Sequence, residues 1–371
     1  MSRSLRIAYL AHAVRSDWNN GNAHFLRGLL RGLVALGHDV AVFEPCPAWS
    51  ISNLCDESLG AASLSQFSAT YPELHVTPYN AVPLYNPAFW RNALKGRDVV
   101  ILHEWNPPEL AAALLEIRPQ MGFRLLFHDT HHRASSSPEQ IRFFGTQRFD
   151  GILAFGDSLR RIYQERFGIR NVWTFHEAAD ATVFYPQAGT PKTTDVVWIG
   201  NWGDEERSKE ICDFLLRPAM ELRNRRFQIF GVRYPDQGLA ALSSAGVDYG
   251  GYLPNLEASA AYARSRLTVH IPRQQYATAM HGIPTIRVFE ALACGIPLIS
   301  APWDDDEQLF CEGDLLFVGS GAEMKRAMKK LLTDESAART QALRGLETIL
   351  SRHTCAHRAT QLIDICEELL Q

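Results

Sequence analysis

Short apolar runs alternate with amphipathic stretches along most of the chain, and this alternation is the strongest constraint on its fold. The run LRIAYLA at residues 5–11 has no strict polar–apolar alternation, which is typical of a strand covered on both faces of a parallel sheet. The next stretch, NAHFLRGLLRGLVALG, places large apolar residues at helical spacing and ends at Gly37, which fits a helix C-cap. DVAVF follows as a second strand, so the sequence predicts a βαβ unit.

The same pattern then repeats in two halves of similar size. Strand-like runs DVVILHE, RLLFHD, GILAF and NVWTF follow in the first half, although residues 45–95 are too irregular for their elements to be predicted. A polar, turn-forming stretch at 186–194 suits a hinge, and the alternation then resumes from DVVWIG to IPLIS. We predict two α/β domains, each with a Rossmann-like, doubly wound parallel sheet, over residues 1–187 and 188–371. The last helix, about 355–371, can pack back on the first domain.

Composition limits the functional classes. A net charge of −4, from 37 basic and 41 acidic residues, gives no reason to expect a nucleic-acid partner. No apolar run approaches 18 residues and the N-terminus lacks a signal-peptide pattern, so we expect a cytoplasmic protein with at most peripheral membrane contact. The seven cysteines show no CxxC spacing, which favours reduced thiols over a zinc or redox site.

Polar loops rich in glycine and histidine follow many of the predicted strands. In an open parallel sheet, the loops at the carboxyl ends of the strands line the ligand crevice, and helix N-termini there offer N–H groups to anions. In the second half these loops are GNWGDEER, GVRYP, GGYLPN, PRQQY and APWDDDEQ, and in the first half they are HAVRSDWNNGNAH, HEWN and HDTHH. The candidate functional residues are therefore expected in these loops.

These residues carry a resemblance to a known family. The second half resembles the donor domain of GT-B glycosyltransferases of group 1 (family 4-like), and within them the CgeB-like branch, through VVWIGNWGDEER, GVRYP, GYLPN, HIPRQQY and above all IRVFEALACGIPLISAPWDDDEQLF. The first half resembles the acceptor domain through GNAHFLRGLLRGLVALGHDVAVF and TFHEAADATVFYP. The resemblance implies two domains facing across a cleft. It also implies metal-independent transfer of a hexose-type sugar from a nucleotide-diphosphate sugar to an acceptor hydroxyl.

The resemblance assigns nucleotide-binding roles to several residues. Glu290 would bind the ribose, because a carboxylate accepts two hydrogen bonds side by side from a diol; the alternative is an ion pair with Arg287 on a solvent-exposed helix face. Tyr252 and Leu253 would contact the nucleobase, or Tyr252 is simply packed beside a glycine turn. The candidates for the diphosphate are Arg207, Gly200, Asn201, Arg273 and Arg287. The alternative for each of these arginines is an exposed helix position.

Acidic residues are candidates for the donor sugar. Asp304 and Asp305 would bind sugar hydroxyls, although a solvated acidic turn is an equal alternative and a DxD-type metal site a weaker one. Retaining relatives place a second acidic residue eight positions before the ribose-binding glutamate. That position is Gly282 here, so the acidic pair is incomplete and the stereochemical outcome is left open.

Histidines are candidates for the chemistry. His12 follows the first strand, where inverting relatives keep a general base, and His128 lies where retaining relatives place a histidine near the donor sugar. Either could instead be solvated or structural. Asn22 and His24 are candidates for the acceptor, or His24 caps its helix. HDTHH matches no usual zinc spacing, so no metal site is expected.

Two rival functions remain open from the sequence. One is a sugar-nucleotide epimerase of the same fold, and the other is a non-catalytic sugar-nucleotide-binding or structural protein of the CgeB type. The expected ligand is a UDP, GDP or dTDP sugar as substrate, with no cofactor. The acceptor would be a glycan, a lipid-linked acceptor or a small molecule.

Overall fold

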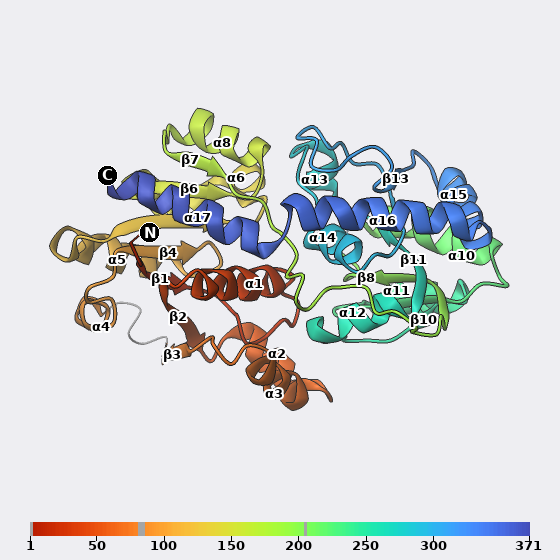
Figure 1. Cartoon of the computed structure of the whole chain (residues 1–371), viewed down its shortest axis with the longest axis horizontal. Helices are drawn as coiled ribbons and strands as arrows, with labels where there is room; N and C mark the ends of the chain where they lie inside the picture. The colour runs from red at the N-terminus through yellow and green to blue at the C-terminus, as the bar shows by residue number, and fades with distance from the viewer. Residues whose placement is uncertain (1–2, 81–85, 204–205) are drawn as a thin grey trace. The chain divides into compact units, whose positions relative to one another are not determined.

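The structure, a computed structural model, describes residues 3–80, 86–203 and 206–371, and Figure 1 shows the whole chain. The chain forms two compact units. Unit 1 comprises the residues up to Glu177 together with Cys355–Gln371, and unit 2 comprises Ala178–Thr354. The division therefore lies at 177/178, whereas the sequence suggested 187/188, and the last helix is grouped with unit 1.

Unit 1 is built on a seven-stranded sheet whose neighbouring strands are parallel, in the order β3-β2-β1-β4-β5-β6-β7. The central strands are almost entirely buried apolar residues, as the uninterrupted apolar runs predict. The strand order reverses between β1 and β4, so a crevice is expected at the carboxyl ends of these two strands. The strands are β1 (Arg6–Leu10), β2 (Asp39–Cys46), β3 (Val76–Asn80), β4 (Val99–His103), β5 (Arg124–Asp129), β6 (Gly151–Ala154) and β7 (Val172–Thr174).

The helices of unit 1 connect these strands. The region that the sequence pattern left unassigned, 45–95, contains two helices after β2, the strand β3 and a further short helix. The helices are α1 (Asn22–Ala35), α2 (Trp49–Asp56), α3 (Gly60–Thr70), α4 (Pro87–Ala93), α5 (Pro108–Met121), α6 (Arg133–Ser136), α7 (Pro138–Arg142), the 3₁₀ turn η2 (Thr146–Arg148), α8 (Asp157–Phe167) and α17 (Cys355–Leu370).

The C-terminal helix α17 packs along α1 within unit 1 (Figure 1). Gly32 of α1 lies at the closest point of this contact, because a Cβ placed there would be 2.8 Å from Cβ of Ala359. Further contacts tie α17 to the strand β7 and the segment after it, since Arg358 Nε donates to His176 O at 3.0 Å and Gln361 Nε2 donates to Thr174 O at 2.9 Å. The end of the chain is therefore part of the first fold unit.

Unit 2 contains a six-stranded parallel sheet in the order β10-β9-β8-β11-β12-β13. Its order reverses between β8 and β11, which gives unit 2 a crevice position of its own. The strands are β8 (Thr194–Ile199), β9 (Phe227–Phe230), β10 (Asp248–Tyr249), β11 (Ser265–His270), β12 (Leu298–Ser300) and β13 (Leu316–Phe317).

Helices flank these strands. The helical segment after β8 is interrupted by a π-helical turn, and the helix that contains Glu290 begins at Ile286. The helices of unit 2 are α9 (Ser208–Ile211), the π-helical turn η3 (Cys212–Leu216), α10 (Arg217–Glu221), α11 (Asp236–Ser244), α12 (Asn255–Ala263), α13 (Gln274–Thr278), α14 (Ile286–Ala293), α15 (Gly321–Thr333) and α16 (Glu335–Arg352).

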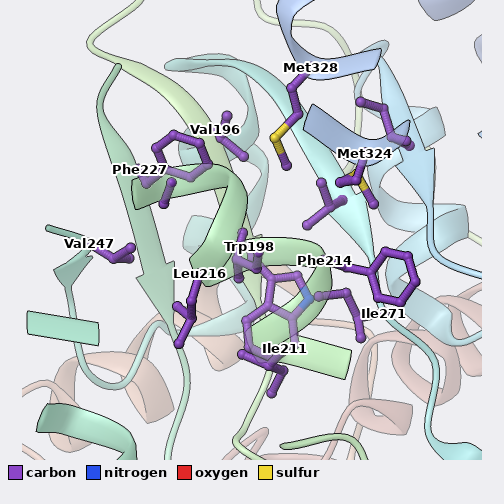
Figure 2. Close-up of a cluster of buried hydrophobic side chains, with 14 of the residues drawn as sticks. Val196, Trp198, Ile211, Phe214, Leu216, Phe227, Val247, Ile271, Met324 and Met328 are labelled. Atoms are coloured by element: carbon purple, nitrogen blue, oxygen red, sulfur yellow. The ribbon is translucent and has the colours of Figure 1, made fainter. Parts of the chain in front are cut away.

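One face of the unit 2 sheet packs on an apolar cluster, shown in Figure 2. Val196 and Trp198 of β8 and Phe227 of β9 meet side chains from the η3 turn and from α15. Met324 and Met328 of α15 are fully buried at the four-residue spacing of one helix face. This cluster anchors β8, the strand after which the candidate phosphate-binding loop begins.

No helix in residues 3–80, 86–203 or 206–371 is long and apolar enough to cross a membrane.

The α1–α17 contact can be tested with a reciprocal pair of substitutions. We expect Gly32→Val to lower the free energy of unfolding by about 1–3 kcal/mol, because the new side chain overpacks against Ala359. Adding Ala359→Gly should recover part of this loss, and chemical denaturation of both single variants and the double variant measures the coupling. Additive effects of the two substitutions would contradict the contact.

Candidate functional site

Arg207 connects the two loops that follow the central strands of unit 2. Its Nη2 donates to Asn201 O at 2.7 Å and to Asn201 Oδ1 at 2.5 Å, in the loop after β8. Its Nη1 lies 3.4 Å from the carbonyl oxygen of Ile271, directly after β11. The guanidinium also lies over the ring of Trp198, at 5.2 Å from its centroid. Arg207 is therefore held at the strand-order reversal, together with the predicted loop residues Gly200 and Asn201.

The three predicted phosphate-binding arginines lie close enough for Arg273 and Arg287 to affect the pKa of Arg207. Arg273 forms an ion pair with Glu206 at 2.6 Å, and Arg287 forms one with Glu290 at 2.5 Å. Burial, and then the positive charge of Arg273, lowers the pKa of Arg207 to about 10, with a smaller lowering by Arg287, while Tyr234 and the charge of Glu206 act in the opposite direction. Arg207 nevertheless remains a cation at neutral pH. Among the described residues, which do not include Asp204 and Glu205 of the GDEER motif, no carboxylate pairs with it.

Glu290 is fully buried in α14, so it does not lie on a solvent-exposed helix face. The predicted alternative partner, Arg287, does contact its Oε2, and Asn255 Nδ2 donates to its Oε1 at 2.9 Å. Asn255 is the first residue of α12 and follows the GGYLP segment. The hydrogen bond between Asn255 and Glu290 thus joins the loop predicted for the nucleobase to the residue predicted for the ribose.

The GGYLP loop approaches its neighbours closely. A Cβ at Gly250 would lie 2.3 Å from the ring of Phe230, and Gly251 has a φ of +67°, so both positions favour glycine. Gly231 N donates to Gly251 O at 2.9 Å, which ties this loop to the end of β9. Tyr252 and Leu253 are partly buried beside it.

Polar atoms without protein partners lie near Arg207 at the ends of β11 and β12. His270 is buried, and its Nδ1 contacts Ser300 Oγ at 2.9 Å. Ser300 Oγ donates its hydrogen to Ala301 O, so His270 Nδ1 is the donor to Ser300 and His270 Nε2 is left as an acceptor. Burial lowers the pKa of His270 to about 3, which keeps the ring neutral. In the described part of the chain, His270 Nε2, Arg207 Nε and Trp303 Nε1 have no hydrogen-bond partner.

The predicted donor-sugar residues lie in two loops that are joined by a hydrogen bond, one before α14 and one after β12. Gly282 N donates to Asp304 O at 2.9 Å, and the side chain of Asp304 is mostly exposed, with Oδ2 3.2 Å from His281 Nδ1. Gly282 has a φ of +83°, and a Cβ there would meet Glu307 at 2.9 Å. The carboxylate of Asp305 accepts from the backbone N–H groups of Leu309 and Phe310, so it shapes this loop.

The corresponding edge of unit 1 contains a second polar cluster. His128, the penultimate residue of β5, is fully buried among aromatic rings, and its Nδ1 lies 2.5 Å from Tyr9 Oη of β1. Burial lowers the pKa of His128 to about 3, so the ring is neutral. Its neighbour across the β4–β5 pairing, His103, is also buried, and the two rings meet edge-on at 5.6 Å.

Two carboxylates share one arginine beside these histidines. Arg133 forms an ion pair with Glu104 and donates to Glu104 O at 2.6 Å, and Glu104 is fully buried at the end of β4. Burial, and then the charge of Asp129, raises the pKa of Glu104 to about 8. Burial also raises the pKa of Asp129 to about 6, although Tyr163 Oη donates to it at 2.5 Å. Two buried carboxylates facing one guanidinium favour retention of a proton.

The remaining candidates of unit 1 lie around this cluster. His12 is partly buried in the loop after β1, and its ring lies 6.4 Å from that of Trp105. Burial and the charge of Arg133 lower the pKa of His12. Asn22 Nδ2 donates to Thr130 Oγ1 at 2.5 Å, which joins the start of α1 to the loop after β5. His24 is fully buried within α1.

The structure adds residues to which the sequence analysis gave no role. In unit 1 these are His103, Glu104, Trp105 and Arg133, and in unit 2 they are Asn255, His270 and Trp303. Most of them lie at or directly after the end of a strand, in the segments HEW and HIP. This position is the sequence signal by which they could have been found. The described residues contain no group of three or more His, Cys, Asp or Glu side chains that could hold a metal ion.

The chain is similar to a known protein family and to solved structures. Residues 207–364 match a family model described as "Glycosyl transferase-like". No curated protein sequence matches the chain.

Solved structures of similar fold cover almost the whole chain. Anabaena Alr3699/HepE in complex with UDP and glucose is 12% identical with a TM-score of 0.70, over 98% of this chain and 100% of that one. Sucrose-phosphate synthase from Thermosynechococcus elongatus is 14% identical with a TM-score of 0.65, over 98% and 99%. A glycosyltransferase from Rickettsia africae is 10% identical with a TM-score of 0.67, over 100% of both chains. At these identities the likeness shows the fold, and it is the GT-B fold that the sequence predicted.

The raised pKa of Glu104 predicts that the stability of the protein depends on pH. Native Glu104 keeps its proton up to a pKa of about 8, whereas an unfolded glutamate loses it near pH ~4.3, so the native state binds more protons between these values. Glu104 should therefore contribute a fall in stability as pH rises from about 7.5 to 8.5. Below this range unfolded histidines (pKa ~6.5) still bind protons that the buried, neutral histidines do not, and this effect has the opposite sign. We expect Glu104→Gln to flatten this fall in chemical denaturation series. Exposed Glu165→Gln is the control and should leave the slope unchanged, and an unchanged slope in Glu104→Gln would contradict the assignment.

Proposed function

We propose that this chain, which has the GT-B fold and whose residues 207–364 match the glycosyl transferase-like family, transfers a sugar from a nucleotide-diphosphate donor bound by unit 2. One observation carries the proposal. Arg207 is a buried cation whose hydrogen bonds go to neutral oxygens, within the electrostatic influence of two more arginines. A diphosphate would give Arg207 an anionic partner, which it does not have among the described residues.

The residues around Arg207 suit the other parts of a nucleotide sugar. Glu290, which accepts hydrogen bonds from Arg287 and Asn255, would bind the ribose, because a carboxylate accepts several hydrogen bonds side by side. The adjoining loop with Tyr252 and Leu253 would receive the base. His270 Nε2, a buried acceptor, would receive a hydroxyl of the transferred sugar.

The same arrangement favours departure of the leaving group. Bond breaking leaves additional negative charge on the diphosphate, and Arg207 is already oriented by Asn201 and Ile271 before that charge develops. Such preorganised cations stabilise a transition state without having to reorient. Trp303 Nε1 and Arg207 Nε remain as further N–H donors.

Unit 1 would supply the acceptor side. A lowered pKa keeps His12 neutral at pH 7, so its ring can accept a proton from an acceptor hydroxyl. His128 is neutral as well, and its Nε2 has no partner among the described residues. Both histidines remain candidates for the chemistry.

We further propose that the donor is a UDP-hexose. Structures of similar fold contain UDP, among them HepE with UDP-glucose and an α-glucosyltransferase with UDP and DNA. Thermal denaturation with UDP, GDP, dTDP and their hexose conjugates tests this choice, because a ligand that binds only the native state raises the melting temperature.

Substitution of Arg207 tests the donor site itself. We expect Arg207→Gln to weaken binding of UDP roughly 10- to 100-fold, because it removes a charge-assisted contact worth about 1.5–3 kcal/mol. Glutamine keeps a polar side chain next to Asn201, and a native melting temperature of the unliganded variant would confirm its folding. The control, Arg339→Ala, removes an exposed arginine of α16 and should bind UDP like the wild type. Equal UDP affinity in Arg207→Gln and the wild type would contradict the site.

A further inference from the structure

A large aromatic side chain is exposed at the candidate acceptor edge of unit 1. Trp105 directly follows the buried Glu104 at the end of β4, yet 39% of its surface is accessible. β4 is one of the two strands between which the strand order of the sheet reverses, so the ring lies where a ligand crevice is expected. A tryptophan in this position exposes apolar surface that a ligand could cover.

The orientation of this ring is fixed by its neighbours. The guanidinium of Arg133 lies over the ring, with Cζ 4.2 Å from its centroid. Arg133 is itself held by the backbone carbonyl and the carboxylate of Glu104. The ring of His131 meets Trp105 at 4.9 Å, at an angle of 68°. Arg133 thus packs on one face of the Trp105 indole and holds its orientation. A ligand that stacks on the ring would therefore lose little free energy in ordering this side chain.

Polar groups lie near the Trp105 ring. The ring centroid of His12, in the loop after β1, lies 6.4 Å from that of Trp105. Asn22 donates a hydrogen bond to Thr130, which precedes His131 in the loop after β5. An acyl chain would require a continuous apolar surface, which these neighbours interrupt. A nucleic acid would require cations for its phosphates, but Arg133 is already paired with Glu104 and the chain has a net charge of −4.

A pyranose ring fits both features. One of its faces consists of C–H groups that stack on an aromatic ring, and its rim consists of hydroxyls that require hydrogen-bonding partners. We propose that the acceptor is a carbohydrate whose terminal sugar ring stacks on Trp105, with a hydroxyl directed to His12. This inference rests on the proposed function, since it names the substrate class of the second substrate site. Arg133 acts as a positioning residue for the tryptophan.

Saturation-transfer NMR on the full chain tests the proposal. The probes are the methyl glycosides of glucose, galactose, mannose and N-acetylglucosamine, each with and without UDP. We expect at least one of them to bind the wild type, and Trp105→Ala to weaken its binding roughly tenfold or more through loss of stacking. Trp105→Phe, which retains an aromatic face, should recover part of the affinity. The control, Phe143→Ala, removes another exposed aromatic side chain of unit 1 and should bind like the wild type.

The outcomes separate this inference from the donor proposal. Saccharide binding that is unchanged in Trp105→Ala would overturn the stacking site. Binding of 4-nitrophenol or 1-octanol, with no saccharide binding, would overturn the carbohydrate assignment in favour of an aromatic or lipid acceptor. The shift in melting temperature caused by UDP should be the same in Trp105→Ala and the wild type. If UDP shifts the melting temperature of neither the wild type nor Trp105→Ala, the donor site is contradicted. The saccharide-binding result is then judged on its own.

Discussion

Unbalanced charge at the end of the second sheet is the constraint on which this account depends. Arg273 and Arg287 each have a carboxylate partner, whereas Arg207 is buried against neutral oxygens. Burying a charge without a directly paired counter-charge is costly, and in the part of the chain that the structure describes no carboxylate pairs with Arg207, although the charge of Glu206 acts on it from nearby. The arrangement becomes reasonable if the protein binds an anion there. The hydrogen bond from Asn255 to Glu290 then connects this anion site to the candidate ribose and base positions.

The equivalent edge of the first unit contains buried carboxylates and histidines. Glu104 and Asp129 are both buried beside the single cation Arg133, and the nearby histidines are neutral. The neutral histidines suit a hydroxyl that must lose its proton, just as the buried cation Arg207 suits a departing diphosphate. The two parallel sheets thus present complementary chemistry at their carboxyl ends. Trp105, held by Arg133, adds an apolar face to the first of these sites.

The sequence predicted the features that depend on local pattern. Uninterrupted apolar runs identified the central strands, loops after strands identified Arg207 and His12 as candidates, and the family resemblance pointed to Glu290. The pattern could not place β3 or β13, because they are short or largely exposed and depend on pairing with neighbouring strands. It also could not assign a role to Glu104, Arg133 or Asn255, because each depends on a partner that lies far away in the sequence. The alternative ion pair of Glu290 with Arg287 exists, but its carboxylate is fully buried and does not lie on a solvent-exposed helix face.

The most direct test of the central claim is a calorimetric comparison of uridine, UMP and UDP binding to the wild-type chain. If the arginine cluster is a diphosphate site, affinity should rise at each step from nucleoside to monophosphate to diphosphate, and the gain should shrink as salt concentration increases. Equal affinities for uridine and UDP, while uridine binds measurably, would show that the cluster makes no use of its positive charge. That result would contradict the account.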